Sequence, residues 1–436
     1  MSAEGAEGPE RANQSPPASG AEFTPAYSRY ALGALFVLYV FNFIDRQLLN
    51  LFVEPIKGEL GVSDTAMGAV TGLSFALFYT LAGFPMARWA DRNSRTGLIA
   101  VGLVLWSAMT ALSGWTRSFW ELAAARVGVG VGEASFTPSA HSLISDYFPA
   151  AKRATALATF AAGASMGNIL GFLGGGYLGE EVGWRNTFVL LGLLGLPVAV
   201  VFRWTVREPA RTIPAAARDE SIWTVWRALM SRPAFFFLAI SASLHGFSSY
   251  GASAWSAAFL MRVHELSLFE TGAVMALTAG VAATLGQIIA GRLADRLGAR
   301  DVRWYMFLPA ITSALSLPFL IAFFAAGDLA WWLAAYVPGT LISVMWTGPT
   351  YAMAQSIAKP HMRAMASAII IFLLNLVGMG LGPLLVGALN DLLTPSFGVE
   401  AIRYSLMLAV VPHALASIFN LRAARTLRED LAFGRS

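Results

Sequence analysis

The sequence predicts an all-α membrane protein with twelve transmembrane helices in two six-helix pseudo-symmetric halves. Of the 436 residues, 56% are hydrophobic and only 13% are charged, whereas soluble domains carry about 25% charged residues. Twelve apolar stretches each approach or exceed the ~20 residues that a helix needs to cross a bilayer. A third observation is a loop motif that occurs twice, about half a chain apart. Together these features predict a duplicated bundle of spanning helices.

The twelve spans follow one another with short connections and one longer interruption. They cover residues 29–52, 65–87, 96–116, 119–146, 154–179, 185–204, 233–260, 268–291, 303–325, 329–355, 364–390 and 401–421. Residues before the first span are rich in Ala, Glu, Pro, Ser and Gly, a composition typical of a disordered tail. The predicted units are a cytoplasmic tail, an N-terminal half, a cytoplasmic linker, a C-terminal half and a second cytoplasmic tail, at 1–28, 29–204, 205–232, 233–421 and 422–436.

The positions of Lys and Arg predict the orientation of the chain. With the N-terminus inside, 23 of these residues fall on the inner side, five fall on the outer side, and Arg46 and Arg126 lie within spans. Inner loops of membrane proteins carry the excess of Lys and Arg. We therefore expect both termini in the cytoplasm. High Arg over Lys usage and short loops favour a bacterial inner membrane.

The linker at 205–232 is basic and contains Pro209 and Pro214. It is either an ordinary connection or the site of a short interfacial helix. The helix would present one apolar face made of Trp223, Trp226, Leu229 and Met230.

The fourth span carries two charged residues in a largely apolar run. Arg126 and Glu133 lie seven residues apart, about two helical turns, so both project from one face. A charge within a membrane segment normally faces a protein interior or a water-filled cavity. Gly128, Gly130 and Gly132 let another helix or a ligand approach closely.

The first span brings two more charges to a similar depth. At 1.5 Å per residue, Asp45 lies ~24 Å beyond the start of its helix. Arg126 then lies ~9 Å, and Glu133 ~20 Å, from the outer end of the fourth span, by the same rise per residue. We expect Asp45 and Glu133 to carry protons and Arg126 to be their switchable partner. The alternative is a fixed ion-pair lock between the two helices.

The C-terminal half offers polar and aromatic side chains in place of mid-span charges. We expect a cavity with charge on its first wall, where Arg46 or Arg126 binds an anionic headgroup through its guanidinium fork. The second wall would receive an apolar tail, although aromatic residues in helices are more often packing. Its candidate residues are His245, Tyr250, Trp255, Gln287, Trp346, Tyr351 and Asn375.

A repeated loop carries the first family resemblance. The stretch Gly291–Arg300 follows the eighth span, and a looser copy, Ala87–Arg95, follows the second, with Asp295 and Asp91 at matching places. The pattern G-x-x-x-D-R-x-G-x-R resembles the signature of the major facilitator superfamily. This resemblance implies the major facilitator fold, a transporter with alternating access between two halves.

Three further stretches look like the spinster family within that superfamily. They are Phe43–Arg46 in the first span, Arg126–Ser135 in the fourth, and Asp146–Arg153 at its end. Members of that family move lysolipids and sphingolipid-like amphiphiles, so the resemblance implies a substrate of that kind. Charges at the cytoplasmic helix ends resemble a latch for the outward-open state, with anchoring by positive charge as the alternative. The expected latch residues are Asp91, Arg92, Arg95, Asp146, Arg153, Asp295, Arg296 and Arg300.

The predicted function is proton-coupled transport of a lysolipid or sphingolipid-like amphiphile by alternating access. A nearer alternative is a proton-driven transporter of drugs or small organic anions. An alternative from another class is a membrane-embedded lipid-modifying enzyme, but no hydrolytic arrangement and no H-E-x-x-H pattern occurs. Cysteine is absent, and we expect no cofactor and no metal. The expected partners are membrane lipids, the substrate and protons, with no nucleic acid, and a monomer is the default for this architecture.

Overall fold

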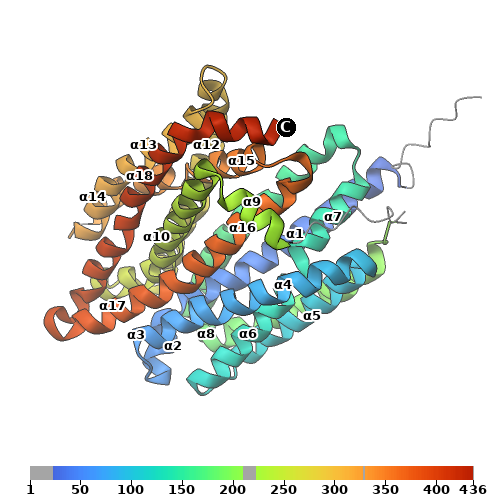
Figure 1. Ribbon diagram of the computed structural model, residues 1–436. Helices are drawn as coiled ribbons and strands as arrows, with labels where there is room; N and C mark the ends of the chain where they lie inside the picture. The colour runs from blue at the N-terminus through green and yellow to red at the C-terminus, as the bar shows by residue number, and fades with distance from the viewer. Residues whose placement is uncertain (1–22, 210–221, 328, 436) are drawn as a thin grey trace, which may run out of the picture.

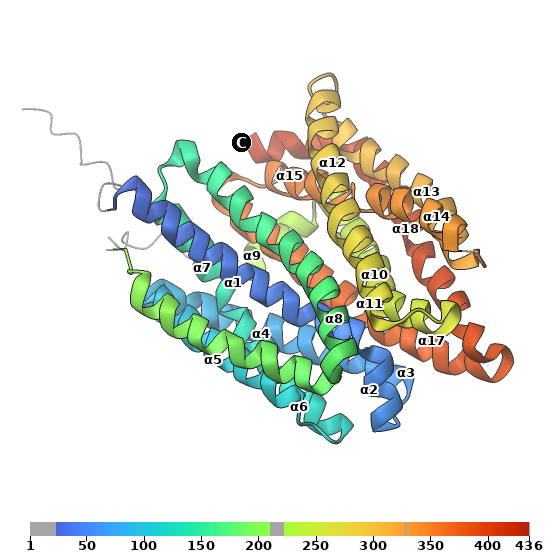
Figure 2. The same cartoon turned by 180° about the vertical axis from the view of Figure 1, so that it is seen from behind.

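Two helical bundles lie side by side in the computed structural model of the chain, which describes residues 23–209, 222–327 and 329–435 (Figure 1). These residues contain helices and no strand. The twelve predicted spans are all found in helices, and the all-α prediction is confirmed. Because an even number of crossings returns the chain to its starting side, both ends lie at the same end of the bundles (Figures 1 and 2). We call this side the terminal face and the other the opposite face.

The N-terminal half contains the first six spans. Its helices are α1 (Pro25–Leu51), α2 (Val53–Leu60), α3 (Asp64–Gly68), the π-helical turn η1 (Ala69–Leu73), α4 (Ser74–Arg92), α5 (Arg95–Ser113), α6 (Phe119–Ala134), α7 (Phe136–Tyr147) and α8 (Ala150–Thr205). At 1.5 Å per residue, α8 is far too long for a single crossing. It reverses at Gly183, whose φ of 80° and ψ of 160° leave the helical region. This break separates the fifth and sixth predicted spans.

The C-terminal half contains the remaining six spans. Its helices are α10 (Pro233–His264), α11 (Leu268–Met275), η2 (Ala276–Ala282), α12 (Ala283–Gly298), α13 (Trp304–Ala325), α14 (Leu329–Ser343), α15 (Thr347–Ile357), η3 (Pro360–Met362), α16 (Arg363–Leu373), η4 (Leu374–Leu381), α17 (Gly382–Phe397), η5 (Gly398–Glu400) and α18 (Ala401–Arg435). The last helix continues through most of the segment at 422–436 that the sequence analysis places in a tail.

Length and hydropathy support membrane crossing. Seven helical stretches among the described residues are long and apolar enough to span, and the bent pair of α9 (Ile222–Met230) and α10 is an eighth. Two of the seven, Ala151–Thr205 and Met365–Gly434, are long enough for two spans each. The protein is therefore a multi-pass membrane protein.

The linker forms a short helix next to the second half, while residues 210–221 lie outside the described part of the chain. Helix α9 meets α10 at 97°. Leu229 is fully buried, but Trp223 is 75% exposed. The interfacial-helix alternative is correct about the helix. At 100° per residue, Trp223 and Leu229 lie about 120° apart around the helix, at the two edges of the predicted face.

Close packing of α8 on α1 holds the first half together. The glycines of the ridge Gly163-x-x-x-Gly167-x-x-x-Gly171 all face the backbone of α1. A Cβ on Gly167 would lie 2.7 Å from the carbonyl oxygen of Val40, closer than packed atoms tolerate. The absence of side chains here lets the two helices touch, as small residues do at interfaces of membrane helices.

The two halves contact each other at the opposite face. There, α3 and η1 cross α17 and η4, and α8 crosses α11 and η2. A Cβ on Gly68 would collide with the backbone of Pro383, and one on Gly272 with the backbone of Phe172. Glycine at these crossings therefore permits direct backbone contact between the halves. Three of the crossing segments are π-helical, a distortion that is common at functional sites.

Candidate functional site

A buried ion pair links α1 to α6 near the centre of the N-terminal half. Asp45 is 4% exposed and Arg126 is 2% exposed. The Nη1 atom of Arg126 lies 3.3 Å from Oδ2 of Asp45, and the Thr110 hydroxyl donates to Oδ1 at 2.8 Å. Both carboxylate oxygens are therefore engaged, which a buried charge requires. The predicted pairing of Asp45 with Arg126 is present.

A second pair crosses the same two helices in the other direction. The Nε and Nη2 atoms of Arg46 lie 2.8 and 2.7 Å from Oε2 of Glu133. Glu133 is fully buried, and its Oε1 has no hydrogen-bond partner. The sequence analysis pairs Arg126 with both carboxylates. In the structure, Glu133 pairs with Arg46 instead. Asp45 and Arg46 are neighbours, about 100° apart around the helix, so each reaches a different residue of α6.

Local sequence explains why α6 presents these groups. Gly130 packs beneath Phe75 of α4, and Gly132 packs against Gly102 of α5. The glycines bring α6 close to two neighbouring helices, and its charged face is buried as a result. The helix breaks at Ser135, just past Glu133, because Pro138 has no N–H to donate to the carbonyl four residues earlier.

A small cavity lies between the two halves beside these pairs. Its volume is about 90 Å³, and Arg46 and Arg126 both line it. The other lining residues are Phe43, Gln47, Leu49, Asn50, Thr71, Phe75, Tyr250, Ser253, Ala254, Met379 and Pro383. Water takes about 30 Å³ per molecule, so this volume accepts a few waters or a small polar group. The charged side chains come from the N-terminal half, and the C-terminal half contributes an apolar and hydroxyl-bearing wall.

Of the seven residues proposed for that second wall, Tyr250 lines this cavity. Trp255 lies nearer the opposite face, where its indole N–H donates to the carbonyl of Pro383. His245 and Trp346 are stacked on each other within the C-terminal bundle. Of the remaining three, Tyr351 on α15 is half-buried and Asn375 in η4 is buried. Gln287 on α12 is exposed.

The comparison with known protein families agrees with this architecture. The model of the Major Facilitator Superfamily matches residues 35–383, well over half of the chain. The chain belongs to the Major Facilitator Superfamily. Its fold is thus the predicted major facilitator fold, and the protein is a secondary transporter rather than an enzyme.

Relatives place this superfamily member near spinster proteins. An MFS-type efflux pump of Mycolicibacterium smegmatis is 34% identical, covering 93% of this chain and 95% of that protein. Protein spinster homolog 1 of Homo sapiens is 27% identical, with coverages of 93% and 82%. The crystal structure of a bacterial homologue of the human lysosomal transporter spinster, inward-facing and unoccupied, superimposes with a TM-score of 0.86. It is 29% identical, with coverages of 94% and 99%. The predicted spinster resemblance is confirmed.

At the terminal face of this transporter, two of the predicted latch residues, Arg95 and Asp146, contact each other within the N-terminal half. Arg95 is 1% exposed, and its guanidinium binds Asp146 and the hydroxyl of Ser142. It also binds Glu208 at 2.7 Å, a residue that the sequence analysis missed. Glu208 additionally accepts the backbone N–H of Thr96 at 2.8 Å. A carboxylate directly after the sixth span, in an arginine-rich segment, is the signal that could have identified it.

The other predicted latch residues of the transporter whose side chains are described do not join this cluster. Arg153 donates to the carbonyl of Phe148 at 3.0 Å, and Asp295 accepts the hydroxyl of Tyr305 at 2.7 Å. Arg296 and Arg300 are exposed at the end of α12. The side chains of Asp91 and Arg92 lie outside the described residues.

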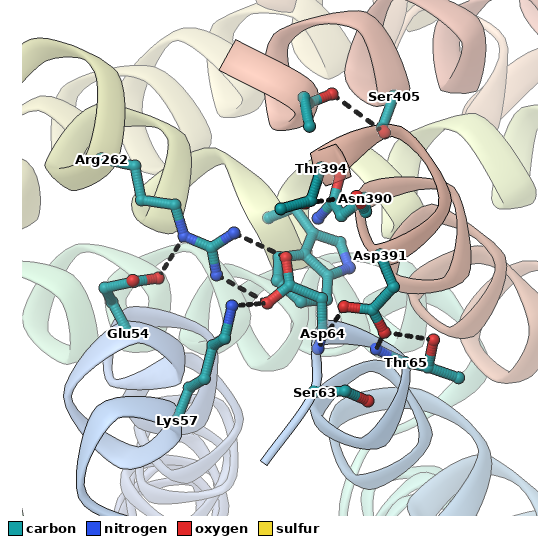
Figure 3. A network of polar contacts seen from close by, with 12 residues as sticks. Glu54, Lys57, Ser63, Asp64, Thr65, Arg262, Asn390, Asp391, Thr394 and Ser405 are labelled. Carbon is teal, nitrogen blue, oxygen red and sulfur yellow. Dashed lines mark hydrogen bonds and ion pairs between the residues drawn. The ribbon is translucent and has the colours of Figure 1, made fainter. Parts of the chain in front are cut away.

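A polar network that the sequence analysis did not anticipate joins the halves at the opposite face (Figure 3). Asp64, at the start of α3, is 1% exposed. It accepts Nη2 of Arg262 from α10 at 2.8 Å and also binds Nη1 of Arg262 and Nζ of Lys57. Arg262 bonds Glu54 as well. Arg262 is thus held by two carboxylates from the other half.

A third carboxylate completes this network from α17. Asp391 accepts the backbone N–H groups of Asp64 and Thr65 at 3.0 and 2.8 Å, and the Thr65 hydroxyl at 2.6 Å. These are donors at the N-terminus of α3, where an anion is favoured. We call Glu54, Lys57, Asp64, Thr65, Arg262 and Asp391 the opposite-face lock. Opening of this face requires these contacts to separate.

Glu208 provides a prediction about pH. Burial raises the pKa of its carboxyl, but hydrogen bonds from Thr96 and Arg95 outweigh burial and hold the pKa below its usual range. A depressed pKa means that the stabilisation is complete above the unfolded value of ~4.3 and is lost as the pH falls through the folded value. We expect Glu208→Gln to lower stability by about 1–3 kcal/mol, equally at every pH from about 8 to 5.

Thermal unfolding of the purified transporter across pH measures this difference. The exposed Glu181 supplies a matched control, Glu181→Gln, expected to unfold like the parent at each pH. The difference in unfolding temperature between the parent and Glu208→Gln should decrease only below about pH 5. A gap that narrows steadily between pH 8 and 5 would contradict the assignment, because Glu208 would then titrate in that range.

Proposed function

We propose that this transporter couples proton movement to the transport of an anionic amphiphile, with a lysolipid or sphingolipid-like molecule as substrate. The observation that carries the proposal is the pair of buried arginine–carboxylate contacts beside one cavity, Arg46 with Glu133 and Arg126 with Asp45. Each arginine is held by a group that a proton can neutralise. Such intramembrane charges are typical of proton relays and ion pathways.

Proton loading and anion binding support each other in this arrangement. A proton on Glu133 removes the charge that holds Arg46, and Arg46 already lines the cavity. The freed guanidinium can then bind a phosphate in a bidentate manner. Loss of the proton restores the internal pair and expels the anion. One acid and one arginine thus form an exchange unit, and Asp45 with Arg126 forms a second.

The surrounding aromatic rings favour a substrate with organic character. The Arg46 guanidinium lies 4.9–5.2 Å from the rings of Phe43, Phe75 and Tyr79. These rings stabilise the cation while its carboxylate partner is neutral. The same rings offer apolar contact to the first part of a tail. An amphiphile would therefore meet a charged group and an apolar surface within one site.

Orientation follows from the distribution of charge. We infer that both termini face the cytoplasm of a bacterial inner membrane, because Lys and Arg gather in the loops of the terminal face. The opposite-face lock is then the outer gate, and it is closed, as an inward-facing state requires. The bacterial spinster homologue that superimposes on this chain is also described as inward-facing. A monomer is sufficient for this arrangement, because both halves belong to one chain.

A second candidate function is export of a drug or small organic anion. The efflux pump of Mycolicibacterium smegmatis, at 34% identity, favours it over the spinster relatives on sequence likeness alone. The cavity volume of about 90 Å³ also suits a small group. Both functions would use the same arginines, so the substrate must be identified by experiment.

Flux of a lysophospholipid in proteoliposomes tests the proposal. We expect flux that increases with an imposed pH gradient and is inhibited by a second lysolipid, but not by a drug-like cation. Inhibition by a short dicarboxylate instead, without lysolipid flux, would favour the organic anion candidate. Recovery of a chemically altered lipid by mass spectrometry would contradict the transporter-only conclusion.

A further inference from the structure

The C-terminal half contains a buried histidine pair with incomplete hydrogen bonding. His245 on α10 is 0% exposed, and His413 on α18 is 2% exposed. Their ring centroids lie 5.0 Å apart, edge to face. Nδ1 of His245 and both ring nitrogens of His413 have no hydrogen-bond partner. Unpartnered buried polar atoms are costly, and this group of three requires an explanation.

Hydrogen bonding determines which nitrogen of His245 carries the proton. The Ser313 hydroxyl donates its single proton to the carbonyl of Pro309. Its oxygen, 3.3 Å from Nε2 of His245, can therefore only accept. Nε2 is then the N–H donor. The atom of Asn420 that lies 3.4 Å from it is Nδ2, and the amide accepts from Nε2 when it is turned by 180° so that Oδ1 faces the ring. Nδ1 is left with a lone pair directed at no donor.

One neighbour of this ring, the indole of Trp346, can stabilise a positive charge on it. The imidazole of His245 stacks on the indole of Trp346, with centroids 4.7 Å apart and planes 7° apart. A cation above an indole face is stabilised by the ring's electrons. Among the described residues, His413 is the titratable side chain whose charge interacts with that of His245. Two imidazolium groups this close would repel each other, so the pair holds one proton at most.

A break in the tenth span adds negative partial charge. Helix α14 ends at Ser343, and helix α15 begins at Thr347. In the last turn of α14, the Thr340 carbonyl accepts the Ser343 hydroxyl and the Ile342 carbonyl accepts the Met345 N–H, which leaves the Ser343 carbonyl at the end of this helix. The Ser343 carbonyl approaches the ring of His413, although no hydrogen bond of good geometry forms in the described state. The C-terminal end of a half-helix attracts cations, and transporters bind coupling ions at such ends.

We propose that His245, His413, Asn420 and the carbonyl end of α14 form a second proton-binding site, in the C-terminal half of the transporter. Proton binding places an N–H on Nδ1 of His245 and leaves its Nε2–H bonded to Ser313. The positive charge on the histidine pair is stabilised by the indole face of Trp346 and by the carbonyl end of α14. The site is separate from Glu133 and Asp45, and it does not depend on the identity of the substrate.

Nitrogen-15 NMR of the full-length protein in lipid bilayers tests this site without any substrate. The chain has five histidines, so labelled imidazole gives few signals. His245→Gln and His413→Gln assign the two buried rings, and His361→Gln, at an exposed position, is the matched control. Spectra are recorded from pH 8 to 4 for the parent and for Arg262→Met, which weakens the opposite-face lock.

We expect one buried ring to become doubly protonated within this range in at least one of these two proteins. Trp346→Leu should move that midpoint to lower pH by about one unit, because the cation–π contact is lost. This variant retains both histidines, so it remains informative if His245→Gln does not fold. Buried rings that stay neutral to pH 4 in both proteins, or a midpoint unmoved by Trp346→Leu, would overturn the proposal. Neither result bears on lysolipid transport by the first site.

Discussion

Glu133→Gln is expected to abolish the response of transport to a pH gradient while leaving the protein folded. The amide keeps the size of Glu133 and one oxygen for Arg46, but it cannot take up or release a proton. In the parent, a gradient of about one pH unit can drive about tenfold accumulation for each coupled proton. In the variant this ratio should fall to about one. Flux in proteoliposomes, with and without the gradient, is the measurement.

A matched control lies on the same helix. Glu121 is exposed in the first turn of α6, so Glu121→Gln should keep the gradient response of the parent. Asp45→Asn should behave like Glu133→Gln if both acids carry protons. A parent-like response in both Glu133→Gln and Asp45→Asn would mean that these residues form a fixed ion-pair lock between α1 and α6.

Removal of Arg262 is expected to shift the transporter toward a state open at the opposite face. Arg262 is held by Asp64 and Glu54 of the other half. Its loss leaves Asp64, which is 1% exposed, with Lys57 as its remaining cation. Breaking a buried pair by removing one partner costs about 3 kcal/mol or more, so Arg262→Met should change the ratio of states by ~100-fold.

Reactivity of one introduced cysteine measures this shift. The chain has no cysteine, so Ser253→Cys in the cavity supplies a unique thiol. A membrane-impermeant thiol reagent added at the opposite face should react much faster in the Arg262→Met background. Arg185→Leu is the control, because Arg185 pairs with Glu59 at the same face but within one half. Equal reactivity in the parent and Arg262→Met would contradict a gating role for the lock.

A double variant separates two effects of removing Arg262: loss of its attraction to Asp64, and the uncompensated charge that remains on Asp64. Arg262→Met leaves the Asp64 carboxylate with less compensation, whereas Arg262→Met combined with Asp64→Asn removes both partners. Partners that interact directly give non-additive effects. The double variant is therefore expected to react more slowly with the reagent than the sum of the two single effects predicts.

Much of the fold was predictable because it depends on local properties of the chain. Apolar length identifies spanning helices, and the repeated loop identifies two halves. The same reasoning located Asp45, Arg46, Arg126 and Glu133, since a charge in an apolar run is conspicuous wherever its partner lies. It did not identify Glu208, because a carboxylate just outside a span looks like an ordinary loop residue. Its significance comes from Arg95, which lies on another helix.

The sequence did not identify the opposite-face lock either. Lys57, Asp64 and Arg262 stand at helix ends, where charged residues are normal. Their burial results from the contact between α3, α10 and α17, which no single segment specifies. The histidine pair is a similar case, because His245 and His413 come from helices that are far apart in the chain.

The sequence by itself determined the membrane spans, the duplication into halves, the family and the four charged residues of the candidate site. Only the tertiary structure decided that Glu133 binds Arg46 and Asp45 binds Arg126, that Tyr250 lines the cavity, and that Asp64 closes the opposite face. The physical reason is that a helix is specified by interactions over a few residues, whereas pairing between helices depends on their rotation and depth. Those are set by packing at glycine contacts and helix breaks, such as Gly132 against Gly102 and the break at Ser135.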